Sequence, residues 1–362
     1  MSVEALPPGA VIGIIGGGQL GRMLAMAAAR LGYRTVVLEP ERSCPAAQVC
    51  NAHIIAAYDD RDALRRLALE SEVITYEFEN VPVKAVQDLT LMQPVYPPPR
   101  ALEMAQDRIT EKDFLNSSGI ATVRYHAVAD IVEVRAGLRE FGGKGILKTR
   151  RMGYDGKGQV TLDINDEAAI DKAWDRLSDQ PLILESFVKF EREISVIAAR
   201  DSRGHMAFFD VSENTHNDGI LATSTVPARI TEEMTAIAHD MACRLLTGLD
   251  YVGVLGLELF ALPDGSLLAN EFAPRVHNSG HWTEAACAVN QFDQHIRAIA
   301  GLPLGDTKRH SDCVMENLIG QDVNRVAKLA AQRNAVIHLY GKTEVRPGRK
   351  MGHVTHIKPM AG

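Results

Sequence analysis

Short runs of β-branched and aliphatic residues alternate with helical patterns over the first 89 residues, and this alternation constrains the fold more than any other feature of the chain. The strand-like runs lie at 11–15, 35–39, 52–57 and 72–77, and the clearest helical pattern lies at 20–32. Strands that alternate with helices build βαβ units and a parallel sheet. Prolines concentrated in 94–100 then end the pattern, so we expect a parallel βαβ domain over residues 1–100.

The order of elements becomes mixed after residue 100. A helical pattern covers 101–118, and strand-like runs lie at 121–128, 145–149, 181–186, 192–200 and 205–214. A helix is predicted from Thr231, which suits its N-cap, to about residue 247, where Gly248 suits its end. We expect a second domain over 101–300 and a small β-rich third domain over 301–362, so the chain as a whole is mixed α/β (α+β).

Composition limits the classes of protein that fit. The chain has 362 residues, enough for two to three domains of ~150 residues. Its 46% hydrophobic and 23% charged residues are ordinary for a globular protein. A net charge of -7 argues against a nucleic-acid partner. No stretch approaches the ~20 apolar residues of a membrane span, and five cysteines without a C-x-x-C pair favour a cytoplasmic protein.

The first glycine-rich segment, GGGQLG at 16–21, follows a strand, opens a helix and matches G-x-G-x-x-G. Glu39 ends the next strand, close to where a ribose-binding acid would lie in a dinucleotide site. Small residues let backbone N–H groups and a helix N-terminus approach any anion. From this segment alone, a nicotinamide or flavin site, another phosphate site and a structural tight turn all remain open.

A second glycine-rich segment, 150–160, follows a strand that contains Lys148. Glycines among cationic and hydroxyl-bearing side chains suit a lid that closes over polyphosphate, although the segment is not a Walker A loop. Lys148 supports this prediction because a buried lysine in an apolar strand needs an anionic partner. The alternative is a hairpin with a solvated, charged tip.

Two glutamates, Glu258 and Glu271, flank a predicted hairpin turn at 263–265. The hairpin would bring their carboxylates together beside Asn270, and such oxygen donors suit Mg²⁺. Because two carboxylates repel, a bound cation explains the pair better than a hydrophobic core does. Two solvated glutamates at a hairpin edge are the alternative.

Donor-rich segments lie on either side of the third domain's boundary. APRVHNSGHW at 273–282 places many donors next to the predicted metal pair and indicates an anionic substrate group. Arg346, Arg349 and Lys350 put three cations into a predicted basic loop, 344–353, enough for a phosphate monoester. A structural loop and an exposed basic loop, respectively, remain the alternatives.

Together these motifs resemble the ATP-grasp superfamily, and within it the 5-(carboxyamino)imidazole ribonucleotide synthase family. The resemblance covers nearly the whole chain and rests on GGGQLGRM, TYEFENV, DRITEK, ILKTRRMGYDGKGQ, THNDGI, NEFAPRVHNSGHW and EVRPGRKMGH. It implies a pre-ATP-grasp domain, a two-lobed ATP-grasp domain with its lid at 150–160, and a small third domain. Relatives commonly continue with another helix beyond the position of Gly362, so we expect an abbreviated third domain.

The resemblance also implies a reaction of purine biosynthesis. ATP phosphorylates bicarbonate to carboxyphosphate, and the CO₂ released is captured by the exocyclic amine of 5-aminoimidazole ribonucleotide (AIR). ADP and phosphate are the other products. ATP and Mg²⁺ are the implied cofactors, a homodimer the implied assembly, and transfer of the labile product to a downstream mutase is an implied possibility.

Residue roles follow by motif from the same resemblance. The implied ATP-binding residues are Arg108, Lys148, Gly153, Tyr154, Asp155, Gly156, Lys157, Gly158, Gln159, Glu185, Ser186, Phe187, Val188, Glu193, His216, Asn270 and Glu271. The implied catalytic residues are Tyr154, Asp155, Lys157, Arg275 and Asn278, and the metal ligands are Glu258 and Glu271. The implied AIR-binding residues are Gln19, Leu20, Glu77, Glu79, Arg275, His277, Asn278, Arg346, Arg349 and Lys350.

Two rival functions remain at this stage. Another ATP-grasp ligase of purine metabolism would share the nucleotide site and differ in the acid or amine that it joins. A nicotinamide-dependent oxidoreductase would explain the 16–21 segment and Glu39, but it leaves the 150–160 segment and the glutamate pair without a role.

Overall fold

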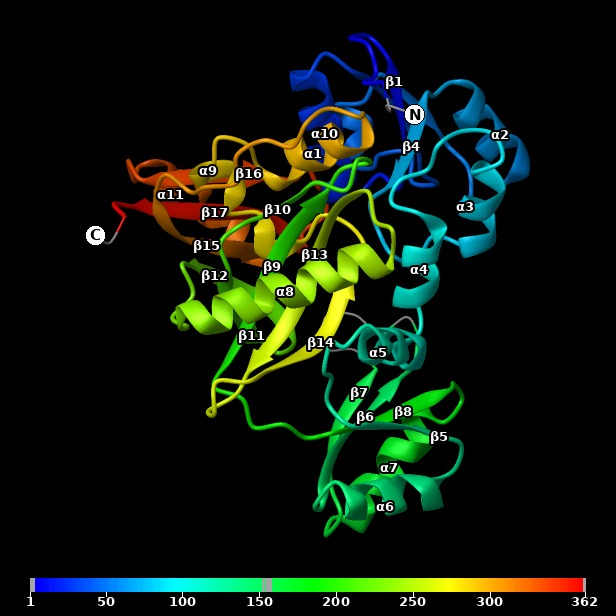
Figure 1. Cartoon of the computed structure of the whole chain (residues 1–362), viewed down its shortest axis with the longest axis vertical. Helices are drawn as coiled ribbons and strands as arrows, with labels where there is room; N and C mark the ends of the chain where they lie inside the picture. The colour runs from blue at the N-terminus through cyan, green and yellow to red at the C-terminus, as the bar shows by residue number, and fades with distance from the viewer. Residues whose placement is uncertain (1–3, 152, 154–157, 361–362) are drawn as a thin grey trace.

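The structure is a computed structural model that describes residues 4–151, 153 and 158–360. Three sheets organise the chain, and Figure 1 shows them as an N-terminal part, a large central sheet and a small lobe at one end of the longest axis. All five cysteines lie in the described residues and are free. Within these residues, no helix is both long and apolar enough to cross a bilayer.

The N-terminal sheet is parallel, as the alternating pattern predicts, with strand order β3-β2-β1-β4. Its elements are β1 (Val11–Ile15), α1 (Gln19–Arg30), β2 (Arg34–Leu38), β3 (Ala52–Ile54), α2 (Arg61–Leu69), β4 (Val73–Tyr76), α3 (Val83–Leu89) and α4 (Pro99–Ala105). Ile15 pairs with both Leu38 and Tyr76, so three strands end at one edge. The residues that follow them, Gly16, Glu39 and Glu77, therefore meet there.

The small lobe is an antiparallel sheet of order β5-β8-β6-β7, covered by two helices. Its elements are β5 (Tyr125–Val128), α6 (Ile131–Glu140), β6 (Lys144–Thr149), β7 (Gln159–Asp163), α7 (Glu167–Leu177) and β8 (Leu182–Ser186). Helix α5 (Arg108–Ser117) leads into this lobe. The strand predicted at 121–128 begins only at Tyr125, and β7 was not expected.

The large sheet has the order β14-β13-β9-β11-β12-β15-β17-β16, with β10 added beside β9. Its strands are β9 (Arg192–Arg200), β10 (Met206–Phe208), β11 (Ser212–Asn217), β12 (Ile220–Val226), β13 (Gly253–Ala261), β14 (Leu267–Ala273), β15 (Asp312–Ile319), β16 (Ala335–Leu339) and β17 (Lys350–Lys358). Its helices are α8 (Glu232–Gly248), α9 (Thr283–Ala286), α10 (Gln291–Ile299) and α11 (Val326–Ala330). Helix α8 packs on one face, and the Thr231 side chain caps it by accepting from the N–H of Met234.

Several predicted limits of single strands, helices and loops in this region are wrong. The run at 205–214 divides into β10 and β11, and Gly248 lies inside the last turn of α8 rather than beyond it. The loop predicted at 344–353 ends early, because Lys350 begins β17. Strands β15 to β17 also continue the central sheet through the pairing of β12 with β15, so the β-rich C-terminal region shares a sheet with the preceding segment.

Candidate active site

A cavity of about 1380 Å³ lies between the small lobe and the large sheet. Lys148 of β6 and Gln159 of β7 line it from the lobe, and Glu193, Glu258 and Glu271 line it from the sheet. Charged side chains from the lobe and from the sheet therefore face one open space, as in a site for a polar ligand.

A buried ion network forms one end of this cavity. Nζ of Lys148 lies 2.7 Å from Oε2 of Glu185, and Nζ of Lys112 lies 3.3 Å from Oε1 of the same carboxylate. Burial works to raise the pKa of Glu185, but the two ammonium groups outweigh it and lower the pKa to about 2. Glu185 therefore stays ionised and holds Lys148 at the cavity wall.

Glu258 and Glu271 face each other across the β13–β14 hairpin, as the turn at 263–265 predicts. Burial, and then the neighbouring Glu271, raises the pKa of Glu258 to about 7. Burial also works to raise the pKa of Glu271, but Arg108 outweighs it and lowers that pKa. Nη1 of Arg108 lies 2.9 Å from Oε2 of Glu271. Arg108 thus keeps one carboxylate ionised while the other holds its proton more tightly, and a divalent cation between them would favour the ionised form of both.

Glu193 and His216 form an ion pair on the wall formed by β9 and β11. Burial works to lower the pKa of His216, but the Glu193 carboxylate outweighs it and raises the pKa. Both side chains are about one-quarter exposed, at 28% and 24%, and both line the cavity. They therefore offer a carboxylate and an imidazole to a polar ligand.

The backbone N–H groups of the glycine-rich segment at 16–21 donate hydrogen bonds to carboxylates of the chain itself. The N–H of Gly17 donates to Oε2 of Glu39 at 2.8 Å, and the N–H groups of Gly18 and Gly21 donate to Glu77 at 2.8 and 3.0 Å. Oε2 of Glu39 also accepts from the hydroxyl of Tyr58 at 2.5 Å. These backbone donors are therefore occupied, and Glu77 is largely used as a structural acceptor.

A second cavity, of about 950 Å³, opens beside the first at the edge of the N-terminal sheet. The two cavities share Gln19, Leu20, Glu79, Arg275 and Lys350. The guanidinium of Arg275 forms an ion pair with Glu79. Residues from α1, from the segments that follow β4 and β14, and from β17 thus meet at one junction, which joins the two cavities.

Asn278 and His277, which follow Arg275 in the chain, line the larger cavity. Both polar atoms of the Asn278 amide are buried and have no hydrogen-bond partner among the described residues, although the residue lines the larger cavity. An amide in this position can hydrogen-bond to a ligand or to water in the cavity. Burial, followed by Arg275, lowers the pKa of His277 to about 3, so its imidazole is neutral.

Other predicted site residues lie apart from the two cavities or outside the described residues. Arg346 forms an ion pair with Glu344, and Arg349 donates to the carbonyl of Glu344 at 3.1 Å. These two arginines do not line the larger or the smaller cavity. Tyr154, Asp155, Gly156 and Lys157 lie outside the described residues, while Gly153 lines the larger cavity. Phe187 is exposed, and its N–H donates to the carbonyl of Lys144 at 3.4 Å.

Three charged residues of the 107–112 segment were assigned no role from the sequence. Lys112 is fully buried and donates to the carbonyl of Asn270, while Glu111 accepts from the N–H of Phe272. Asp107 accepts from Arg150 at 2.9 and 3.0 Å. The DRITEK motif could have pointed to these three residues, because charged side chains on the buried face of a short helix need partners.

Three family models match consecutive parts of the chain. They are the "Ribonucleotide synthetase preATP-grasp domain" at residues 10–106, the "ATP-grasp domain" at 113–292 and the "Phosphoribosylaminoimidazole carboxylase C-terminal domain" at 313–361. An N5-carboxyaminoimidazole ribonucleotide synthase from Brucella melitensis is 64% identical over 359 residues, which cover 99% of both chains. The chain belongs to this synthase family. A Bacillus subtilis member is 43% identical over 99% of this chain and 94% of its own.

Solved structures of the synthase family agree with the fold. An ADP complex of an N5-carboxyaminoimidazole ribonucleotide synthetase has a TM-score of 0.95 at 42% identity, covering 98% of this chain and 94% of its own. A synthase from Aspergillus clavatus, in complex with ADP and 5-aminoimidazole ribonucleotide, has a TM-score of 0.91 at 30% identity, covering 97% and 94%. The mixed α/β fold with an ATP-grasp domain is therefore confirmed. The domain limits at 100 and 300 and the roles of individual residues stay predictions.

Proposed function

We propose that this protein is the ATP-dependent ligase that carboxylates 5-aminoimidazole ribonucleotide in purine biosynthesis. The observation that supports it most is the junction of the two cavities at Gln19, Leu20, Glu79, Arg275 and Lys350. One cavity offers the charge pattern of a nucleotide site, and the other offers room for a second nucleotide. A reaction between an ATP-derived intermediate and AIR needs this adjacency.

The chemistry divides into activation and capture. A bicarbonate oxygen attacks the γ-phosphorus of ATP, the bond to the β-phosphate oxygen breaks, and carboxyphosphate and ADP form. Carboxyphosphate then loses phosphate to give CO₂, and the exocyclic amine of AIR attacks the CO₂ carbon and loses a proton. Enclosure matters because both carboxyphosphate and CO₂ would otherwise be lost to water.

Charged residues have distinct roles in this scheme. Lys148 and Arg108 lie at the wall of the larger cavity and neutralise the polyphosphate. Glu193 accepts from ribose hydroxyls, and its partner His216 contacts the same nucleotide. Arg275 at the junction and Asn278 in the larger cavity bind the anionic intermediate, which would satisfy the unpartnered amide of Asn278.

The donor set fits Mg²⁺. Glu258 and Glu271 lie opposite each other on the paired strands β13 and β14, and Asn270 lines the same cavity. Two carboxylates and one amide thus offer hard oxygen donors at one place on the sheet. The ion, when bound, supplies positive charge that neutralises the phosphate oxygens. Its binding would also offset the burial, and the repulsion from Glu271, that raise the pKa of Glu258.

AIR is assigned to the smaller cavity. Glu79 lines both cavities and is held by Arg275, whereas Glu77 already accepts from two glycine amides. Glu79 is therefore the better candidate for contact with AIR. Lys350 supplies positive charge at the junction for its phosphate, while Arg346 and Arg349 would have to move to reach it.

Several further statements complete the proposal. Bicarbonate is the one-carbon substrate, the enzyme is a cytoplasmic homodimer, and its labile product passes to a downstream mutase. The nicotinamide alternative is disfavoured, because Glu39 is engaged by Gly17 and Tyr58 and the neighbouring amides by Glu77. Neither a membrane nor a nucleic acid is a partner in this scheme.

The test is ADP release from ATP and Mg²⁺, with AIR and bicarbonate each present or omitted. We expect release to require both. Release that needs a different acid or amine would keep the ATP-grasp assignment and reject the substrates. Stabilisation of the protein by NAD rather than by ATP and Mg²⁺ would reject the ligase itself.

A further inference from the structure

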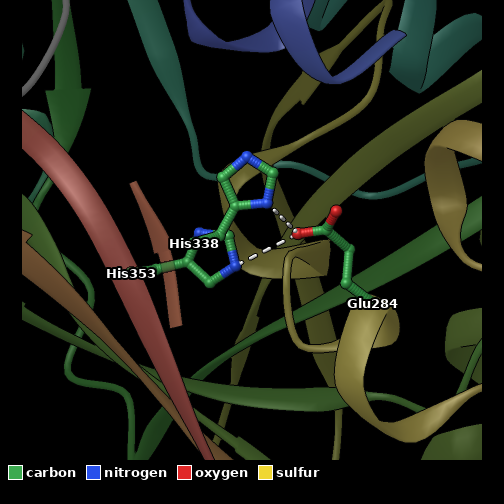
Figure 2. A group of neighbouring side chains, drawn as sticks. All are labelled: Glu284, His338 and His353. Atoms are coloured by element: carbon green, nitrogen blue, oxygen red, sulfur yellow. Dashed lines mark ion pairs between the residues drawn. The ribbon is translucent and has the colours of Figure 1, made fainter. Parts of the chain in front are cut away.

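A cluster of two histidines and one glutamate lies outside both cavities. Glu284 comes from α9, His338 from β16 and His353 from β17, and Figure 2 shows both imidazoles turned toward one carboxylate. Oε2 of Glu284 lies 3.1 Å from Nδ1 of His338 and 3.3 Å from Nε2 of His353. The three atoms all lie within 4.8 Å of one another, so small side-chain shifts would bring them to the ~3.3–3.6 Å separation of donors around a tetrahedral ion.

Hydrogen bonding does not satisfy this carboxylate. Oε2 of Glu284 is buried and accepts no hydrogen bond from any described residue. Both imidazole nitrogens are close enough to donate, so their N–H directions must miss the oxygen. The oxygen therefore depends on the electrostatic attraction of the two imidazoles, and a cation between the three groups would be a stronger partner for it.

A tyrosine supports one of the imidazoles from behind. The hydroxyl of Tyr340 lies 2.9 Å from Nδ1 of His353, and both residues are buried. When Nδ1–H donates to the hydroxyl oxygen, Nε2 presents its lone pair toward Glu284. Metal-binding histidines almost always have such a partner on the second nitrogen, which fixes the tautomer and the ring.

The cluster is deep but can be reached from solvent. The side chain of His353 is 2% exposed, while those of Glu284 and His338 are 22% and 15% exposed. An ion could therefore enter past the glutamate and retain water in its remaining positions. A more exposed pair of the same type, His126 with Glu140 at 2.8 Å, has only two donors and serves as a control.

We infer that Glu284, His338 and His353 form a binding site for a divalent transition-metal ion of the Zn²⁺ class. Two imidazoles and one carboxylate favour such an ion over Mg²⁺, which prefers oxygen donors. The ion would join α9, which follows the 273–282 segment, to β17, which begins at Lys350. It would thereby fix two elements next to the proposed AIR site, without taking part in the reaction.

Metal analysis of the full chain tests this site. Protein free of any histidine tag is stripped with a chelator, and Zn²⁺ is titrated in competition with a chromophoric chelator. We expect one tightly bound Zn²⁺ per chain, and at least about tenfold weaker binding in Glu284→Gln and His338→Asn. His126→Asn should bind as the wild type does. Co²⁺ added to stripped wild-type protein should give visible absorption that Glu284→Gln loses.

Two results would overturn the inference. The first is a wild-type protein that retains no more Zn²⁺ than Glu284→Gln does. The second is loss of Zn²⁺ in Glu258→Gln but not in Glu284→Gln, which would place the ion at the carboxylate pair of the large cavity. If both cluster variants unfold, proton NMR of the wild type decides, because absence of hyperfine-shifted imidazole signals with stoichiometric Co²⁺ bound rejects imidazole ligation.

Discussion

Lys148 and Glu185 form a buried ion pair at the wall of the nucleotide cavity, with Nζ 2.7 Å from Oε2 and the side chains 10% and 3% exposed. Lys112 reaches the other carboxylate oxygen at 3.3 Å. The carboxylate therefore holds two cations in place before any phosphate arrives. Because Lys148 is already held in position, its ordering does not reduce the favourable free energy of ATP binding.

Glu185→Gln should destabilise the protein in a pH-dependent way. The folded-state pKa of Glu185, about 2, lies below its ordinary value of 4.5, so the stabilisation is complete above pH 4.5 and is lost as the pH falls toward 2. The difference in unfolding free energy from wild type should be about 3 kcal/mol at pH 7. Urea unfolding between pH 3 and 7 measures it. A difference that stays constant with pH would contradict the assignment, and Glu140→Gln, at an exposed pair, should cost less than about 1 kcal/mol.

The glutamates at 77 and 79 should separate into structural and substrate-binding roles. Glu77 accepts hydrogen bonds from Gly18 and Gly21. Glu77→Gln should therefore lower the free energy of unfolding by about 1–3 kcal/mol, and with it the melting temperature. Glu79 lines both cavities, so Glu79→Gln should raise the KM for AIR about tenfold or more, in addition to the stability lost with its Arg275 ion pair. Thermal unfolding and steady-state kinetics on both variants decide. The reverse pattern would show that Glu77 contacts AIR.

Gly16 and Gly9 offer a matched test of the turn after β1. Both have positive φ, +102° and +88°, so alanine strains the backbone at either position. A Cβ at Gly16 would lie 2.4 Å from Cγ of Glu77, whereas at Gly9 it would meet nothing within 4 Å. Gly16→Ala should therefore cost about 1–3 kcal/mol more than Gly9→Ala. Equal losses in a denaturant titration would mean that the contact with Glu77 relaxes freely.

The carboxylate pair should be required for nucleotide binding with Mg²⁺. Glu258→Gln and Glu271→Gln each remove one charged oxygen donor, and we expect kcat/KM for ATP to fall about 100-fold or more. Stabilisation by ADP should lose its dependence on Mg²⁺ in both variants, as measured by thermal shift. Glu103→Gln, at an exposed glutamate of α4, should behave as wild type. Retention of the Mg²⁺ effect in both variants would remove these residues as ligands.

The sequence predicted local structure wherever neighbouring residues decide it. The alternation of 11–15 with 20–32 predicted the parallel N-terminal sheet, and Thr231 predicted the start of α8. The turn at 263–265 predicted that Glu258 and Glu271 would be opposed. These features depend on periodicity, capping and turn chemistry, all of which act within a few residues.

Only the tertiary structure decided which segments, distant in the sequence, contact one another. Strand β15 pairs with β12, so the C-terminal strands extend the central sheet and bring Lys350 to the junction beside Gln19. The carboxylate of Glu77 occupies the glycine amides that the sequence alone left open to a phosphate. The cluster of Glu284, His338 and His353 likewise exists only through packing of α9 against β17. Pairing across tens to hundreds of residues depends on which surfaces fit together, and local patterns do not encode that choice.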